Sequence, residues 1–136
     1  MVRAIMSDAN IQGHVIGLLR ILQGPDWGEF WTPLNLEVRT FAEVGLPHDA
    51  SDSEVWDACQ REQISLITAN RNQEGPDSLE AVLRSRNTPS SLPVFTIGDI
   101  QLFAKSRTHA IQVAVRLLDY LMEIDEFRGA GRLYLP

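Results

Sequence analysis

The chain of 136 residues has a single cysteine, Cys59, and no apolar run near the roughly 20 residues that span a bilayer. Disulfide frameworks and cysteine-based zinc sites are therefore excluded, and Cys59 is expected to be a small core residue. The N-terminal residues also lack a basic and then apolar leader. We therefore expect a cytoplasmic protein with no membrane partner.

The chain has fewer basic than acidic residues, with 12 Lys and Arg and 18 Asp and Glu, which gives a net charge of −6. This balance argues against a protein that binds nucleic acid through a broad basic face. It is compatible with a carboxylate cluster that reaches its substrate through a metal ion. Glycine-rich phosphate-binding motifs are also missing, so dinucleotide and P-loop functions lack their phosphate cradle.

What is present is an ordinary globular composition, with 44% hydrophobic and 22% charged residues. Strand-like and helix-like segments alternate along it. The strands are expected at 2–7, 36–41, 64–68 and 92–97, and the helices at 11–22, 51–62, after 77 and at 106–124. This alternation predicts one α/β domain, a three-layer sandwich with a mostly parallel sheet of four or five strands.

The expected core of this single domain, residues 1–136, spans 2–124, and 125–136 form a C-terminal tail. The last helix is expected to bury Ile111, Val115, Leu118 and Leu121 or Met122. Within the tail, the segment 133–135 has strand-forming residues after a glycine-containing hinge. It is expected to pair with a sheet edge of its own chain or of a partner.

Polar residues follow directly on two of the expected strands. They are Asp8 and Asn10 after the first strand, and Asn70, Arg71 and Asn72 after the third, which ends at Thr68. In open α/β sheets, ligands bind at the carboxyl ends of the strands. If these two strands are parallel neighbours, the polar side chains converge on one rim of the sheet, where we expect the function.

Each of these residues also has a purely structural interpretation. Asp8 suits a helix N-cap or a turn as well as a ligand, and Asp52 lies in a capping box that begins at Ser51. Asparagines form turns readily, and Thr68 is expected to orient the turn through its hydroxyl. Arg71 suits either a phosphate contact or a solvated surface position.

Three segments together resemble the PIN-like family, and especially its short prokaryotic members related to toxin ribonucleases. They are Ser7-Asp8-Ala9-Asn10 after the first strand, Ala50-Ser51-Asp52-Ser53-Glu54-Val55-Trp56-Asp57-Ala58 at a helix start, and 64–72. The resemblance covers about residues 2–99, with 51–72 as its most specific part. In that family the last strand is followed by Thr-x-Asp-x-Asp-Phe, whereas this chain has Asn70 and Asn72 in place of both aspartates.

The resemblance implies a Mg²⁺- or Mn²⁺-dependent endoribonuclease of the toxin type, with RNA as substrate and an antitoxin-like protein as partner. The implied catalytic residues are Asp8, Asp52, Asn70 and Asn72, with Asp8 and Asp52 as the metal ligands. Asp77 lies just downstream and is a further candidate ligand that would partly compensate for the lost aspartates. The candidate substrate contacts are Asn10, Thr68 and Arg71. An amide oxygen can ligate a hard cation but brings no negative charge. The depleted acidic site should therefore bind metal more weakly than a site with four carboxylates.

Two other functions stay open. One is a PIN-like domain that has lost catalysis and binds a protein or a nucleic acid, which the paired amides and the lack of a basic surface favour. The other is a small-ligand binder, which needs a deep apolar pocket at the rim. The aromatic cluster of Trp27, Phe30 and Trp31 either covers the edge of the core or forms a contact with a second copy of the chain. The second alternative makes a homodimer a further expectation.

Overall fold

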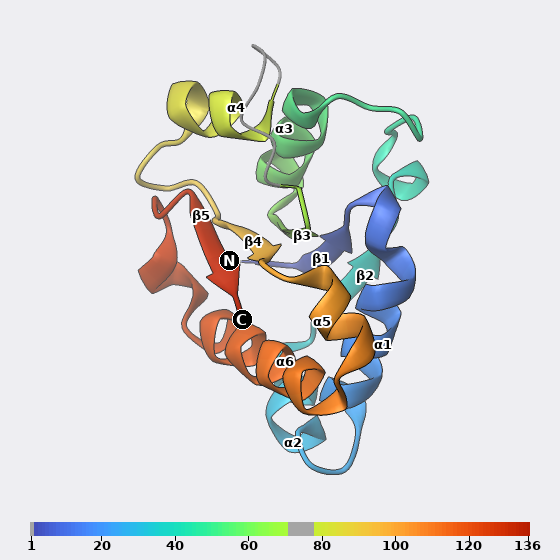
Figure 1. The fold of residues 1–136 in the computed structure, drawn as a ribbon. Helices are drawn as coiled ribbons and strands as arrows, with labels where there is room; N and C mark the ends of the chain where they lie inside the picture. Colours follow the sequence, from blue (N-terminus) through green and yellow to red (C-terminus); the bar gives the residue numbers. More distant parts are fainter. Residues whose placement is uncertain (1, 71–77) are drawn as a thin grey trace.

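The computed structural model describes residues 2–70 and 78–136 (Figure 1). In these residues one all-parallel sheet has the strand order β2-β1-β3-β4-β5. The strands are β1 Ala4–Ser7, β2 Glu37–Arg39, β3 Ile64–Thr68, β4 Val94–Ile97 and β5 Arg132–Leu135. The predicted α/β class with a parallel sheet is therefore confirmed, and the sheet has five strands.

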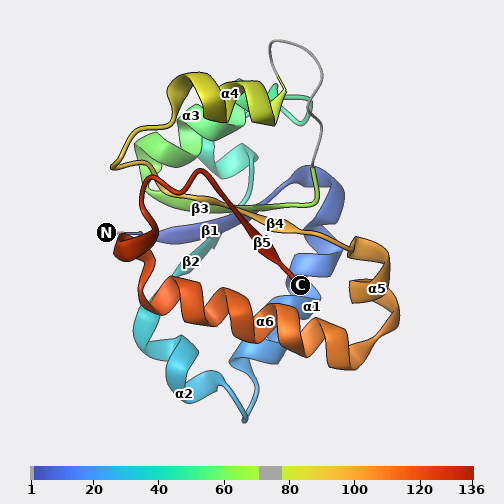
Figure 2. The ribbon, with the colours of Figure 1, turned by 60° about the vertical axis from the view of Figure 1, so that its left-hand side comes forward.

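Helices cover both faces of this sheet, as a three-layer sandwich requires. The α-helices are α1 Gln12–Gln23, α2 Gly28–Trp31, α3 Asp52–Glu62, α4 Leu79–Arg86, α5 Ile100–Lys105 and α6 Arg107–Met122. The short 3₁₀ helices are η1 Ala9–Ile11, η2 Thr32–Leu34, η3 Ala42–Val44 and η4 Ile124–Phe127. Figure 2 shows α3 and α4 on one face and α1 and α6 on the other. Within the described ranges, none of these helices has the length and apolar character needed to cross a bilayer.

The central strands are buried on both faces. Ile5 and Ile67 pack in the cluster under α1 and α6, whereas the alternate residues Met6 and Leu66 pack in the cluster under α3 and α4. This two-sided burial explains why the strands are almost continuously apolar in the sequence. The edge strand β2 differs, because Val38 is 47% exposed.

Helix α3 begins where the sequence predicts. The Glu54 backbone N–H donates to Ser51 Oγ at 3.3 Å, and the Ser51 backbone N–H donates to Glu54 Oε1 at 3.2 Å. These two bonds form the predicted capping box and fix the first helical residue at Asp52. The buried face of α3 consists of Val55, Trp56, Ala58 and Cys59, so Cys59 is the core residue that the sequence predicts.

The C-terminal tail pairs within its own chain, because β5 is a parallel neighbour of β4. The aromatic segment is mostly engaged with the core: Trp31 is 6% exposed and Trp27 packs partly against the core, whereas Phe30 is 44% exposed. The homodimer stays a prediction.

Candidate functional site

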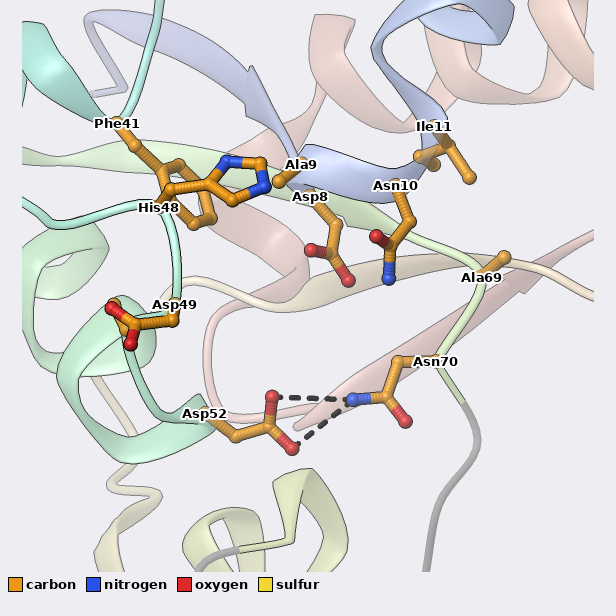
Figure 3. Close-up of a pocket in the computed structure, with 11 residues that line it drawn as sticks. Asp8, Ala9, Asn10, Ile11, Phe41, His48, Asp49, Asp52, Ala69 and Asn70 are labelled. Atoms are coloured by element: carbon orange, nitrogen blue, oxygen red, sulfur yellow. Dashed lines mark hydrogen bonds between the residues drawn. The ribbon is translucent and has the colours of Figure 1, made fainter.

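The strand order leads us to look for a crevice at the carboxyl ends of β1 and its neighbour β3. The helix that follows β1 is α1, on one face of the sheet, whereas the helix that follows its neighbour β3 is α4, on the opposite face. The connections that follow β1 and β3 therefore diverge, which leaves a crevice at the carboxyl ends of these two strands. A hollow of about 410 Å³ lies there, and Figure 3 shows the residues that line it.

Asp8 enters this hollow from the end of β1. Its backbone N–H donates to the Ile67 carbonyl at 2.9 Å, which carries the sheet pairing one residue past the strand. Its carboxylate makes no capping bond to η1 and instead accepts from Thr68 Oγ1 at 3.1 Å through Oδ2. Asp8 thus occupies the N-cap position of η1, but its carboxylate does not cap the helix and lies in the hollow.

Asn70 and Asp52 meet on the other side of the hollow. Asn70 Nδ2 donates to both carboxylate oxygens of Asp52, at 3.2 and 3.1 Å. Asp52 is the first residue of α3, where the helix dipole favours a negative charge. The sequence-predicted residues Asp8, Asp52 and Asn70 are thus brought to one place from three distant segments.

The Thr68 hydroxyl connects the two sides. It is 1% exposed, donates to Asp8 and accepts the Asn70 backbone N–H at 2.9 Å. This matches the predicted role of Thr68 in orienting the turn after β3. One buried hydroxyl therefore sets the positions of an acidic and an amide residue of the hollow.

The side chains face each other across the gap in Figure 3. Asp8 and Asn10 lie on one side and Asp52 and Asn70 on the other, while Asp49 lies to one side of the gap. Sequence reasoning did not single out Asp49. Its one sequence signal is its place in the loop that leads into the capping box.

The oxygen donors of the hollow suit a hard divalent cation in kind. No cluster of three His, Cys, Asp or Glu side chains that could hold a metal occurs in residues 2–70 and 78–136. Mg²⁺, however, usually keeps several waters and is bound by one or two carboxylates together with substrate phosphates. Asp8 and Asp52 supply such a pair, so the residues present fit the group that the resemblance implies.

Of the other predicted site residues, three lie outside the described residues and one lines the hollow. Arg71, Asn72 and Asp77 belong to the segment that the structure does not describe, so their roles stay predictions. Asn10 lines the hollow and is exposed. The hollow has mainly polar side chains, so it is not the deep apolar pocket that a small-ligand binder needs.

The fold and the hollow thus define an α/β protein with an all-parallel sheet and a polar, carboxylate-bearing crevice beside its central strands. Comparisons of the chain with protein-family models, with curated proteins and with solved structures gave no match.

Proposed function

We propose that the chain is a PIN-like protein and that the hollow is the active site of a Mg²⁺- or Mn²⁺-dependent endoribonuclease with fewer carboxylates than the family pattern. The observation that carries this proposal is the pair Asp8 and Asp52, which face each other across a polar crevice at the carboxyl ends of β1 and β3. Metal-dependent hydrolysis of a phosphodiester needs oxygen ligands that hold the cation where the substrate phosphate can reach it.

In this proposal the residues of the chain have separate roles. Asp8 and Asp52 hold the cation, and Asn10, on the exposed side, contacts RNA. When bound, a divalent cation supplies a Lewis acid that activates water and neutralises the charge on the leaving oxygen. Thr68 keeps the Asp8 carboxylate directed into the hollow, and rotation of the Asn70 amide would present its oxygen in place of its nitrogen.

A second candidate is a PIN-like domain that binds an antitoxin-like protein or a nucleic acid without catalysis. One observation favours it: both oxygens of Asp52 accept from the Asn70 amide, and Asp8 accepts from Thr68. Each carboxylate therefore has a hydrogen-bond donor in the absence of a cation. The net charge of −6, which argues against a broad basic face, points the same way.

Titration with Mn²⁺ in a calorimeter separates the two candidates. We expect wild type to bind Mn²⁺ and Asp8→Asn to bind it about tenfold more weakly or worse. Loss of a residue that only supports a metal ligand typically weakens metal binding about tenfold, and loss of a ligand carboxylate should weaken it at least as much. Asp119→Asn is the matched control, since it removes the same charge from an exposed position on α6. Bound Mn²⁺ should also raise the melting temperature by mass action.

The outcomes are distinct. Binding that Asp8→Asn weakens and Asp119→Asn does not, together with Mn²⁺-dependent cleavage of a single-stranded RNA, supports the ribonuclease. A wild-type protein that shows neither heat nor a melting shift at millimolar Mn²⁺ and leaves RNA intact contradicts it. The search for function would then turn to protein partners.

A further inference from the structure

Arg132, the first residue of β5, contacts the backbone of Asn70, one of the residues that line the hollow. Its side chain is 7% exposed, and its Nε lies 2.7 Å from Glu80 Oε1 on α4. Its Nη1 donates to the backbone carbonyl of Asn70 at 2.7 Å and to Thr96 Oγ1 on β4 at 2.6 Å. A single guanidinium therefore joins α4, β4 and β5 to the end of β3.

Stability alone is a poor explanation for this burial. Removing an arginine and a carboxylate from water costs about as much free energy as their attraction returns. In addition, Arg132 Nη2 is buried and has no hydrogen-bond partner in the described part of the chain, which is a further cost. The geometric result of the burial is that a guanidinium N–H is held against the backbone carbonyl of Asn70.

The polar groups of Asn70 are held in three directions. Its N–H donates to Thr68 Oγ1, its Nδ2 donates to Asp52, and its carbonyl accepts from Arg132. The Asn70 carbonyl cannot turn away without breaking its bond to Arg132. The bonds to Thr68 and Arg132 therefore hold both backbone polar groups of Asn70, and with them the direction in which its side chain leaves the backbone.

We propose that Arg132 is a positioning residue for the hollow. The Glu80–Arg132 pair fixes the Asn70 carbonyl and thereby holds the Asn70 amide against Asp52. That this placement matters for a divalent cation rests on the proposed function. The placement of Asn70 by Arg132 does not depend on it.

Amide hydrogen exchange by NMR tests the placement without any metal. We expect Arg132→Lys, which keeps the charge but loses the planar fork, to speed exchange of the Asn70 backbone N–H about tenfold relative to that of Leu66 in β3. Arg128→Lys is the matched control. Arg128 is also mostly buried, at 18% side-chain exposure, and bonds Asp125, Gln63 and the Ser90 carbonyl away from the hollow.

Calorimetry with Mn²⁺ tests the consequence for the site. Arg132→Lys should weaken binding about tenfold, as loss of an outer supporting group typically does. In an Asn70→Ala background the same substitution should have no further effect, because there is no amide left to place. A merely structural role would weaken binding equally in both backgrounds.

The results decide the proposal as follows. Faster exchange at Asn70 in Arg132→Lys but not in Arg128→Lys supports it, and equal exchange in the two variants overturns it. If Arg132→Lys does not fold, Glu80→Gln, which removes the carboxylate that holds the guanidinium, takes its place with the same expected direction. If wild type binds no Mn²⁺, the proposed function fails, while the exchange result still decides whether Arg132 places Asn70.

Discussion

At the scale of a single residue, Thr68 is the point through which the hollow is organised. Its buried hydroxyl donates to a carboxylate and accepts a backbone N–H, so both of its hydrogen-bonding capacities serve the hollow. A side chain of the same shape without the hydroxyl would leave both Asp8 and the Asn70 N–H without this partner.

We expect Thr68→Val to lower the free energy of unfolding by about 1 to 3 kcal/mol, because it removes two hydrogen bonds at a buried position. Urea denaturation followed by circular dichroism measures the change. Thr108→Val, at an exposed position on α6, is the control and should cost less than about 0.5 kcal/mol. Equal losses in the two variants would mean that the Thr68 hydroxyl contributes nothing special.

Sequence reasoning reached Asp8, Asp52 and Asn70 and missed Arg132, and the reason is physical. The first three lie at strand ends or at a helix start, positions that periodicity and capping patterns locate. Arg132 meets Asn70 from 62 residues away, through a long side chain that crosses beneath α4. No local pattern indicates which arginine of a chain reaches which backbone carbonyl.

At the scale of the element, helix α3 determines where the Asp52 carboxylate lies. The helix begins at Asp52 because Ser51 and Glu54 satisfy its free N–H groups. Glu54 is therefore engaged at the cap, whereas Asp52 faces the hollow.

Replacing the cap should loosen this end of the helix. We expect Ser51→Ala to cost about 1 kcal/mol of stability, the usual value of a serine N-cap. Ser85→Ala, at an exposed position near the end of α4, removes a hydroxyl that only bonds carbonyls of its own helix and should cost less than about 0.5 kcal/mol. Thermal or urea unfolding of both variants gives the comparison, and a neutral Ser51→Ala would show that the cap is dispensable.

Two features of the helices were not predictable from apolar spacing. The short helix α5 has an N-cap, since Asp99 accepts from the Leu102 N–H at 3.0 Å, but it is too short to show a periodic stripe. In α6 the predicted burial was right for Leu118 and, of the alternatives Leu121 and Met122, for Leu121, and it was wrong for Ile111 and Val115. Ile111 and Val115 are half-buried and Met122 is 50% exposed, and Ala110, Val113, Ala114 and Leu117 are buried instead. Small alanines in a helix face give little hydrophobic signal although they allow close packing.

At the scale of the whole molecule, Cys59 reports on opening of the fold. It is 1% exposed on the inner face of α3, and burial raises the pKa of its thiol to about 12 from an ordinary value of 9.0. Burial thus favours the neutral thiol in the folded state. The stability that the folded state gains from this pKa difference is complete below pH 9 and is lost as the pH rises towards 12.

We expect a thiol reagent at pH 8 to label Cys59 only as fast as the chain opens, because the thiolate is the nucleophile. Labelling should accelerate with urea in parallel with unfolding. A Cys59→Ala variant that carries Ser85→Cys on the exposed face of α4 should react at once and serves as the control. Prompt labelling of the native wild type would show that α3 opens without global unfolding.

The contact between Arg132 and Asn70 has a consequence for the order of events during synthesis. The Asp8 carboxylate leaves the ribosome early, but Arg132, which holds Asn70, follows 62 residues after Asn70. Translation adds about 5 to 20 residues each second, so β1 to β4 emerge seconds before β5. In that interval the nascent chain carries every described side chain of the hollow without the support that fixes Asn70. The hollow therefore takes its final geometry only when the fifth strand joins the sheet.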